Sequence, residues 1–393
     1  MTIIKKYLGE CPRCLDGSVT MQTLSTNSFC GSIGVHEPPL IKCPNCENLV
    51  WMEEINIVSE VDNDDDSHSW WSWVHELEYI KFLKDGQVNG KKLTNTQRQD
   101  LEQFIAFQEK LKRQILLDDR AKGCLHGMEY ADIGGGTSYM ASLVFESLIE
   151  NKNTGKDKIN LDDIGKRYLE WYNKHAIDTG VVNALVFDLV NEGVSFNEAS
   201  IQVDKKLHGM TASSRPACRA LPITIYLAGL INKNPDMWHF SGSDKFFTNF
   251  IESETKLTHK NVHARQVSMA VNKVCLCLML DFSLDESIKE GAHYLISKTR
   301  ANLGLTHRPK EVTKKDLKNT GYADDAFVAA IWFIRNTDSF DEAVKESIKL
   351  KGKSSYCSVL VGAIGGALYG YSDIKHDIGK TGVFKYYQVE YLT

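Results

Sequence analysis

The stretch that most constrains the fold of this chain is a segment near its C-terminus that is rich in glycine and alanine. It reads SSYCSVLVGAIGGALYG over residues 354–370. In a helix interior a glycine costs about 1 kcal/mol relative to an alanine, so a helix of this composition gains its stability from close packing against other helices. The segment therefore predicts a buried helix over residues 354–369. Its smallest residues are Gly362, Ala363, Gly365, Gly366 and Ala367.

Two more helices are predicted directly upstream of this segment. Small and apolar residues recur there at helical spacing, namely Ala326, Ala329, Ala330, Phe333 and Ile334. The Asp338-Ser339 pair is an N-cap candidate for a second helix over residues 340–350, because such side chains accept hydrogen bonds from the N–H groups of a first turn. Three consecutive helices of this kind predict a mainly α fold.

The first 57 residues carry a different signal, two Cys-Pro-x-Cys pairs separated by 28 residues. Two such pairs supply the four thiolates of a tetrahedral zinc site, which is then closed and structural. The residues between the pairs are rich in Ser, Thr and Gly, as the hairpins of a β ribbon are. We therefore expect a zinc ribbon over residues 1–57, with a redox pair or plain buried thiols as alternatives. The expected zinc ligands are Cys11, Cys14, Cys43 and Cys46.

Two segments of contrasting composition follow the cysteine pairs. Residues 58–67 contain the acidic run EVDNDDD and are expected to form a solvated linker. Residues 68–116 are expected to form a helical connector, which opens with the tryptophans Trp70, Trp71 and Trp73. An aromatic cluster of this kind fits either a core or interdomain seam, or an exposed patch that binds a partner.

The overall composition excludes several classes of function. The net charge of −5 and the few basic residues around the cysteine pairs disfavour nucleic acid as a partner. The chain has no run of about 18 apolar residues and no apolar N-terminal core of a signal peptide. Six further cysteines are scattered in apolar contexts, which is typical of a reducing compartment. We therefore expect a cytoplasmic protein with no membrane partner.

Residues 117 to about 370 resemble the ADP-ribosylglycohydrolase family in several motifs. The sequence RAKGCLHGMEYADIG at 120–134 is similar to the first helix of the family, R-x-x-G-x-x-x-G-x-x-x-G-D-A-x-G. Residues 162–171, followed by Asp178-Thr179-Gly180, are similar to a family helix that leads to Asp-x-Gly. The small residues of 362–370 match the C-terminal signature in register. The resemblance implies an all-α domain over 117–393 and, in the family, magnesium-dependent removal of ADP-ribose from proteins.

The chain departs from this family at the positions that hold the metal. One pair of family aspartates corresponds to Lys353 and Ser355, and the other pair corresponds to Gly136 and Thr137. Magnesium selects carboxylate and water oxygens, so we expect no magnesium and no catalytic residue at these four positions. The family's Asn-Gly beside the ligand is also replaced, by Ser214-Arg215.

Several residues that match the family remain as candidates for lining a ligand cleft. They are Asp132, Asp178, Arg219 and Asp325. In the family, positions such as 132 and 178 help to hold the bundle together, so a scaffold without activity would also keep them. A cleft filled by aromatic side chains such as Tyr356 would exclude a ligand.

These observations favour a catalytically silent family member that acts as a binding module. Some family members are immunity proteins with N-terminal extensions that block a toxin, so the resemblance implies a protein partner, with an ADP-ribosylating toxin as one example. The alternatives are an active ADP-ribosyl hydrolase with a rebuilt site for an ADP-ribose-like ligand, and a subunit that serves only assembly. The tail, residues 381–389, predicts an extended edge strand.

Overall fold

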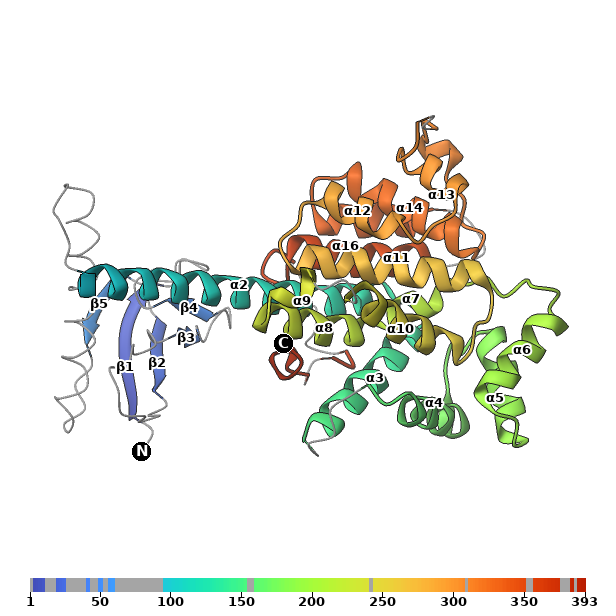
Figure 1. The fold of residues 1–393 in the computed structure, drawn as a ribbon, viewed down its shortest axis with the longest axis horizontal. Coiled ribbons are helices and arrows are strands. Elements are labelled where there is room, and N and C mark those ends of the chain that lie inside the picture. Colours follow the sequence, from blue (N-terminus) through green and yellow to red (C-terminus); the bar gives the residue numbers. More distant parts are fainter. Residues whose placement is uncertain are drawn as a thin grey trace. The chain divides into compact units, whose positions relative to one another are not determined.

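The structure is a computed structural model that divides into two compact units, Met1–Ile115 and Leu116–Thr393. The residues that it describes are 3–10, 19–25, 40–42, 49–51, 56–60, 95–153, 159–239, 243–307, 310–350, 356–374, 382–384 and 387–393. Figure 1 shows that helices dominate the fold and that strands occur near the N-terminus. The predicted mainly α fold is confirmed.

The first unit contains a five-stranded antiparallel sheet with the strand order β4-β3-β2-β1-β5. The longest pairing joins β1 to β2, from Ile3 opposite Ser25 to Gly9 opposite Val19. The four cysteines that the sequence predicts as zinc ligands lie outside the described residues, as do residues 61–94 with their tryptophans. The strands are β1 (Ile3–Glu10), β2 (Val19–Ser25), β3 (Leu40–Lys42), β4 (Leu49–Trp51) and β5 (Asn56–Glu60).

The helix α2 (Asn95–Ala131) is continuous over 37 residues and contributes to both units. Its sequence contains no proline and no glycine before Gly123, so nothing in it breaks the helix. The expected boundary at residue 116 therefore falls inside a single helix.

The second unit consists of helices joined by short connections (Figure 1). Its longer helices are α3 (Gly136–Asn153), α4 (Leu161–His175), α5 (Val181–Asn191), α6 (Phe196–Lys206), α8 (Leu221–Lys233), α10 (Ser243–Lys256), α11 (Val262–Met279), α12 (Leu284–Ala292), α14 (Ala323–Arg335), α15 (Phe340–Ile348) and α16 (Tyr356–Tyr369). The short ones are α7 (Arg215–Arg219), α9 (Asp236–His239), α13 (Ser297–Asn302), η2 (Lys314–Asp316) and η3 (Val389–Tyr391).

Side-chain caps fix the starts of several helices. The Ser339 hydroxyl accepts a hydrogen bond from the Glu342 N–H, as predicted for α15. Asn160 caps α4 in the same way, and Ser283 forms a reciprocal capping box with Glu286 at α12. Each cap satisfies an N–H group that has no partner within its own helix.

The helix α11 lies at the centre of this unit and packs against α7, α8, α10, α12, α14 and α16. Its residues from Ala270 to Met279 are all buried. A helix that is apolar nearly all round is stable only when neighbours cover every face. No helix in the described part of the chain is both long enough and apolar enough to cross a membrane.

The helices α2 and α16 cross in direct backbone contact. A Cβ atom added at Gly362 or Gly366 would overlap the carbonyl oxygen of Gly127 or Gly123, respectively. The glycine-rich segment is therefore a helix that packs closely on another helix, as its composition predicts. The glycines allow an approach that no side chain would permit.

The tail does not form the predicted edge strand in its described residues. Residues 382–384 form a turn, and the chain ends in η3. The Val383 N–H donates to Glu129, and Phe384, Val389 and Leu392 are buried. The described apolar residues of the tail instead pack into the helical core.

Candidate functional site

Gly136 and Thr137, which the resemblance relates to one pair of the family's metal-binding acids, lie at the start of α3, beside α7 and the α4–α5 connection. Asp132 closes the tight connection between α2 and α3. Its carboxylate accepts hydrogen bonds from both the Ser138 N–H and the Ser138 hydroxyl, at 2.8 Å each, and only 7% of the residue is exposed. An acid in this place satisfies an N–H group of the first turn of α3. The structure thus gives Asp132 a capping role.

Gly136 and Thr137 lie in the first turn of α3. At these two positions, the sequence predicts that the metal-binding acids of the family are absent. A Cβ atom at Gly136 would collide with the Asp178 carbonyl, so this position has no space for an acidic side chain. Thr137 is 1% exposed. The other two positions, Lys353 and Ser355, lie outside the described residues.

The side chain of Arg215 occupies the space beside Thr137, although only 3% of Arg215 is exposed. Its Nη1 donates to the Asp178 carbonyl oxygen at 2.6 Å and to the Thr137 hydroxyl at 3.4 Å. Its Nη2 donates to the Asp178 carboxylate at 3.1 Å and to the Tyr356 hydroxyl at 2.6 Å. We name Thr137, Asp178, Arg215 and Tyr356 the Arg215 cluster.

The surroundings of the guanidinium keep it charged. Burial by itself lowers the pKa of Arg215, but the neighbouring Tyr356 and Asp178 outweigh burial and leave this pKa raised. The guanidinium also lies near the face of the Tyr356 ring, with its central carbon 5.0 Å from the ring centroid. A positive charge therefore sits beside Thr137, one of the positions that the resemblance relates to the family's metal-binding acids.

Asp178 holds the connection between α4 and α5 in an unusual backbone conformation, with φ at +49°. Its carboxylate forms an ion pair with Arg215, and 38% of its side chain is exposed. Gly180 follows it, and a Cβ atom at Gly180 would lie 3.3 Å from the Arg215 Nε. The glycine of Asp178-Thr179-Gly180 thus leaves the space that the arginine side chain uses.

A magnesium pair does not fit this donor set. The one carboxylate in the cluster, Asp178, already pairs with a guanidinium, and Thr137 contributes a neutral hydroxyl. In the part of the chain that the structure describes, no group of three or more His, Cys, Asp or Glu side chains could hold a metal ion. Magnesium requires several hard anionic or water oxygens.

Arg219 does not face a cleft, contrary to the expectation from the sequence. Its side chain is fully buried and its Nε forms an ion pair with Glu254 at 2.6 Å. The Tyr168 hydroxyl donates to the same carboxylate oxygen at 2.8 Å, and burial raises the pKa of Glu254 despite the arginine. Arg219 therefore links α7 to α4 and α10 inside the core and is not accessible to a ligand.

Asp325 also lies apart from the Arg215 cluster. It accepts a hydrogen bond from the Thr320 hydroxyl at 2.9 Å and lines a groove beside Lys298 and Lys318. Its neighbour Asp324, by contrast, is buried and contacts His263 Nδ1 at 2.9 Å. Of the four predicted cleft residues, only Asp178 belongs to the cluster.

His259 shows no catalytic contact in the structure. Its Nδ1 lies 2.8 Å from the Thr258 hydroxyl, and the residue is 1% exposed. Burial first, and then the charges of Arg219 and Arg215, hold its pKa well below the ordinary value. It is therefore a neutral core histidine.

The sequence did not reveal the role of Arg215, because a single arginine at the start of a short helix carries no positional signal. The only available hint was its place in the motif, where the family has a glycine beside the ligand. Large apolar side chains in the segments around Asp178 were also not predicted to be exposed. Three of them are strongly exposed, namely Ile133 (73%), Ile177 (63%) and Val181 (71%).

Comparison with known proteins agrees with the fold. The family model described as ADP-ribosylglycohydrolase matches residues 112–383, which is more than half of the chain. The curated relative "ADP-ribosylarginine hydrolase Tri1" from Serratia proteamaculans (strain 568) is 31% identical over 102 residues, which span 25% of this chain and 28% of that protein. A solved structure named "ADP-ribosylglycohydrolase-related protein complex" has a TM-score of 0.52 and 15% identity, covering 70% of this chain and 96% of its own. The last likeness concerns the fold alone.

Proposed function

Because the chain belongs to the ADP-ribosylglycohydrolase family, we propose that it uses the family fold as a protein-binding module and does not release ADP-ribose through a magnesium pair. The observation that carries this proposal is the Arg215 guanidinium, which fills the position beside Thr137 and Asp178. Two unit charges 4 Å apart interact by about 4 kcal/mol in a protein environment, and the interaction is repulsive when both charges have the same sign. A divalent cation beside this guanidinium is therefore strongly disfavoured.

The second support is the apolar rim around the cluster, defined as Ile133, Ile177 and Val181. The connection that carries Ile133 packs on the Asp178 loop, since a Cβ atom at Gly135 would lie 3.9 Å from Ile177. Exposed apolar patches on a soluble domain mark surfaces that bind other molecules. A rim of this kind around a filled site suits a partner that lies across the opening better than a ligand that enters it.

The partner that we propose is another protein, and an ADP-ribosylating enzyme is the first candidate. Its support is indirect: the curated relative is named for removing ADP-ribose from arginine, so proteins of this family meet the products of such enzymes. Apolar anchors at the centre of an interface contribute most of the binding free energy. The rim supplies such anchors, whereas the cluster itself offers only groups that are already paired.

We also propose that the four N-terminal cysteines bind one structural zinc ion. Strands β1 and β3 both pair antiparallel with β2, so they run in the same direction. Cys11 follows the end of β1 and Cys43 follows the end of β3. In the sequence, each cysteine pair thus begins directly after one of two strands that run in the same direction, which supports one shared site with four thiolates.

Calorimetric titration with ADP-ribose, with and without magnesium, tests the proposal that the chain does not act as a magnesium-dependent hydrolase. We expect no magnesium-dependent binding and no release of ADP-ribose from a protein modified on arginine. Binding at micromolar concentration that requires magnesium, or turnover above background, would establish the alternative of a rebuilt hydrolase site.

The rim is tested with one named partner class, a purified arginine-specific ADP-ribosyltransferase, and with two aspartate variants. Val181→Asp places a charge in the rim, and Ile348→Asp places the same charge on α15 at a side chain that is 47% exposed. We expect the transferase to bind the wild type and the Ile348→Asp variant, and to lose at least tenfold in affinity for Val181→Asp. Equal affinity for both variants would refute the role of the rim.

A further inference from the structure

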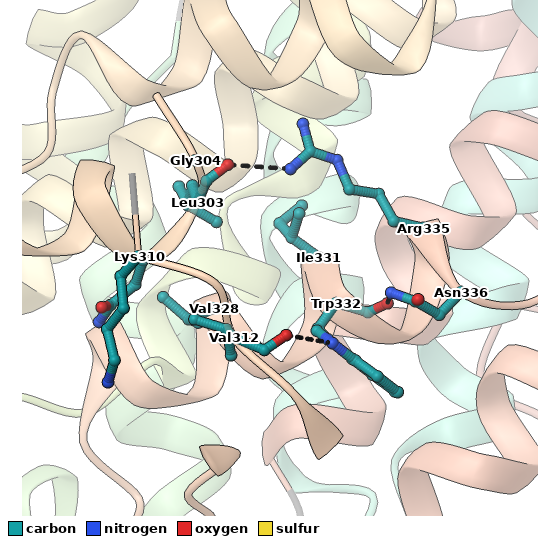
Figure 2. Close-up of a pocket in the computed structure, with 10 residues that line it drawn as sticks. Leu303, Gly304, Lys310, Val312, Val328, Ile331, Trp332, Arg335 and Asn336 are labelled. Atoms are coloured by element: carbon teal, nitrogen blue, oxygen red, sulfur yellow. Dashed lines mark hydrogen bonds between the residues drawn. The ribbon is translucent and has the colours of Figure 1, made fainter. Parts of the chain in front are cut away.

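A groove separate from the Arg215 cluster runs between α13 and α14. It consists of two adjoining cavities of about 230 Å³ and about 320 Å³. Lys310, Val312 and Val328 line both cavities, so the two form the ends of one groove. Figure 2 shows the first end, with the side chains around it. Ligand sites in proteins commonly occupy about 300–1,000 Å³, so this groove has room for a small organic molecule.

One end of the groove is mainly apolar. Its wall includes Val328, Ile331 and Trp332 from α14. The Trp332 indole N–H donates to the Val312 carbonyl at 2.9 Å, as Figure 2 shows. This bond fixes the ring and satisfies its single donor, so the indole offers a ligand only its apolar surface. Arg335, at the same end, donates to the Leu303 carbonyl at 3.0 Å and pairs with Asp285.

The other end of the groove is cationic. Lys298, Lys310 and Lys318 line it, and all three are exposed. Within the described ranges, none of these three lysines forms an ion pair with a carboxylate. The groove thus combines apolar surface along its length with lysine ammonium groups at one end, and this combination favours a ligand that has both an apolar and an anionic part.

Two acids also line the cationic end, and each is engaged by a threonine. Asp316 accepts from the Thr313 N–H at 2.9 Å and from the Thr313 hydroxyl at 2.7 Å. These hydrogen bonds, with a smaller contribution from Lys310, lower the pKa of Asp316. Asp325 accepts from the Thr320 hydroxyl. The acids are thus held by local turns, whereas the lysine ammonium groups remain available to a ligand.

The sequence around the groove has an excess of positive charge that contrasts with the rest of the chain. Residues 298–318 contain seven lysines and arginines and two acids, in a protein of net charge −5. A local excess of cations in an acidic protein attracts anions to one place, and the attraction falls as salt screens it.

We propose that this groove binds a nucleotide, with its base against the partly exposed Val328 and Trp332 and its phosphates beside Lys298, Lys310 and Lys318. Aromatic and aliphatic side chains bury a planar base, and ammonium groups form charge-assisted hydrogen bonds with phosphate oxygens. The site is independent of the Arg215 cluster and of the proposed partner surface.

Isothermal titration of the full chain with ATP, adenosine and tripolyphosphate tests the assignment. We expect ATP to bind with a heat that weakens as salt is raised, and adenosine and tripolyphosphate each to bind at least tenfold more weakly. The double variant Lys310→Glu/Lys318→Glu is expected to lose at least tenfold in ATP affinity. The control Lys289→Glu/Lys345→Glu makes the same change of charge on α12 and α15, away from the groove, and is expected to stay within twofold of the wild type.

Three outcomes would overturn the proposal. The first is a wild type that does not bind ATP, and the second is an equal loss of affinity in the two double variants, which would show a general effect of charge. The third is equal binding of tripolyphosphate and ATP, which would remove the base from the assignment. Thermal melting of each variant confirms that the exposed substitutions leave the fold intact, and Val181→Asp is expected to keep full ATP affinity.

Discussion

Replacement of Arg215 by alanine tests whether its guanidinium holds the cluster together. The side chain donates to the Asp178 carbonyl and carboxylate, to the Thr137 hydroxyl and to the Tyr356 hydroxyl. Its removal leaves these acceptors without their donor. A buried polar group that loses its partner costs about 1–3 kcal/mol, and removal of one member of a fully buried ion pair costs about 3–5 kcal/mol.

The expected loss in unfolding free energy is about 3 kcal/mol, below the sum of the separate contacts. The Asp178 side chain is 38% exposed, so water replaces part of what the arginine supplied. Each kcal/mol shifts the melting temperature by roughly 2–4 °C in a domain of this size, and a fall of about 6–12 °C is expected for Arg215→Ala. Urea unfolding and thermal melting both measure it.

Two controls make the test specific to the cluster. Arg335→Ala removes an arginine whose partner Asp285 is 71% exposed, and a loss below about 1 kcal/mol is expected. Guanidinium chloride at tens of millimolar is expected to raise the melting temperature of Arg215→Ala, because the ion refills the space, whereas sodium chloride at equal ionic strength is not. A loss for Arg215→Ala no larger than for Arg335→Ala, together with no rescue by guanidinium, would refute the reasoning.

Three further predictions concern the packing, the pH dependence and the metal. Gly366→Ala is expected to lower the free energy of unfolding in urea by several kcal/mol, because the added Cβ overlaps the Gly123 carbonyl. The control Gly365→Ala, whose closest contact is at 3.4 Å, is expected to be neutral or stabilising by up to about 1 kcal/mol. Similar losses for both variants would contradict the close crossing of α2 and α16. Burial lowers the pKa of His126 to about 4, so the unfolded chain binds a proton at a higher pH than the folded chain does, and the free energy of unfolding falls as pH drops from about 6.5 to 4. For His126→Phe, urea unfolding at a series of pH values is expected to show a smaller fall of this free energy in that window. An unchanged dependence on pH would contradict the assignment. Metal analysis of the purified chain is expected to find about one zinc ion per chain, and the Cys11→Ser variant is expected to lose this ion. Retention of zinc in the variant would exclude the site with four thiolates.

The glycine-rich helix and the cap of α15 were predictable because their signals are local. Ser339 caps α15 through contacts within four residues, and the composition of residues 354–369 by itself requires close neighbours. Such features depend on short stretches whose physical cause lies within the stretch itself.

The other features depend on contacts between distant segments. Arg219 was expected in a cleft, but its partner Glu254 is 35 residues away and nothing in either local sequence joins them. Arg215 reaches Tyr356 across 141 residues. The tail was read as a strand from its apolar alternation, whereas the helical core decided its conformation. In each case, the packing of the whole unit outweighed the local pattern.

The crossing of α2 and α16 bears on how proteins of this fold are recognised. Gly123, Gly127, Gly362 and Gly366 are required by the distance between two backbones, whatever chemistry takes place elsewhere. A chain that keeps this crossing keeps much of the sequence signature by which it is assigned to its family. The signature therefore records the geometry of two helices, and the identity of the side chains around residues 136, 137 and 215 is the better guide to metal chemistry.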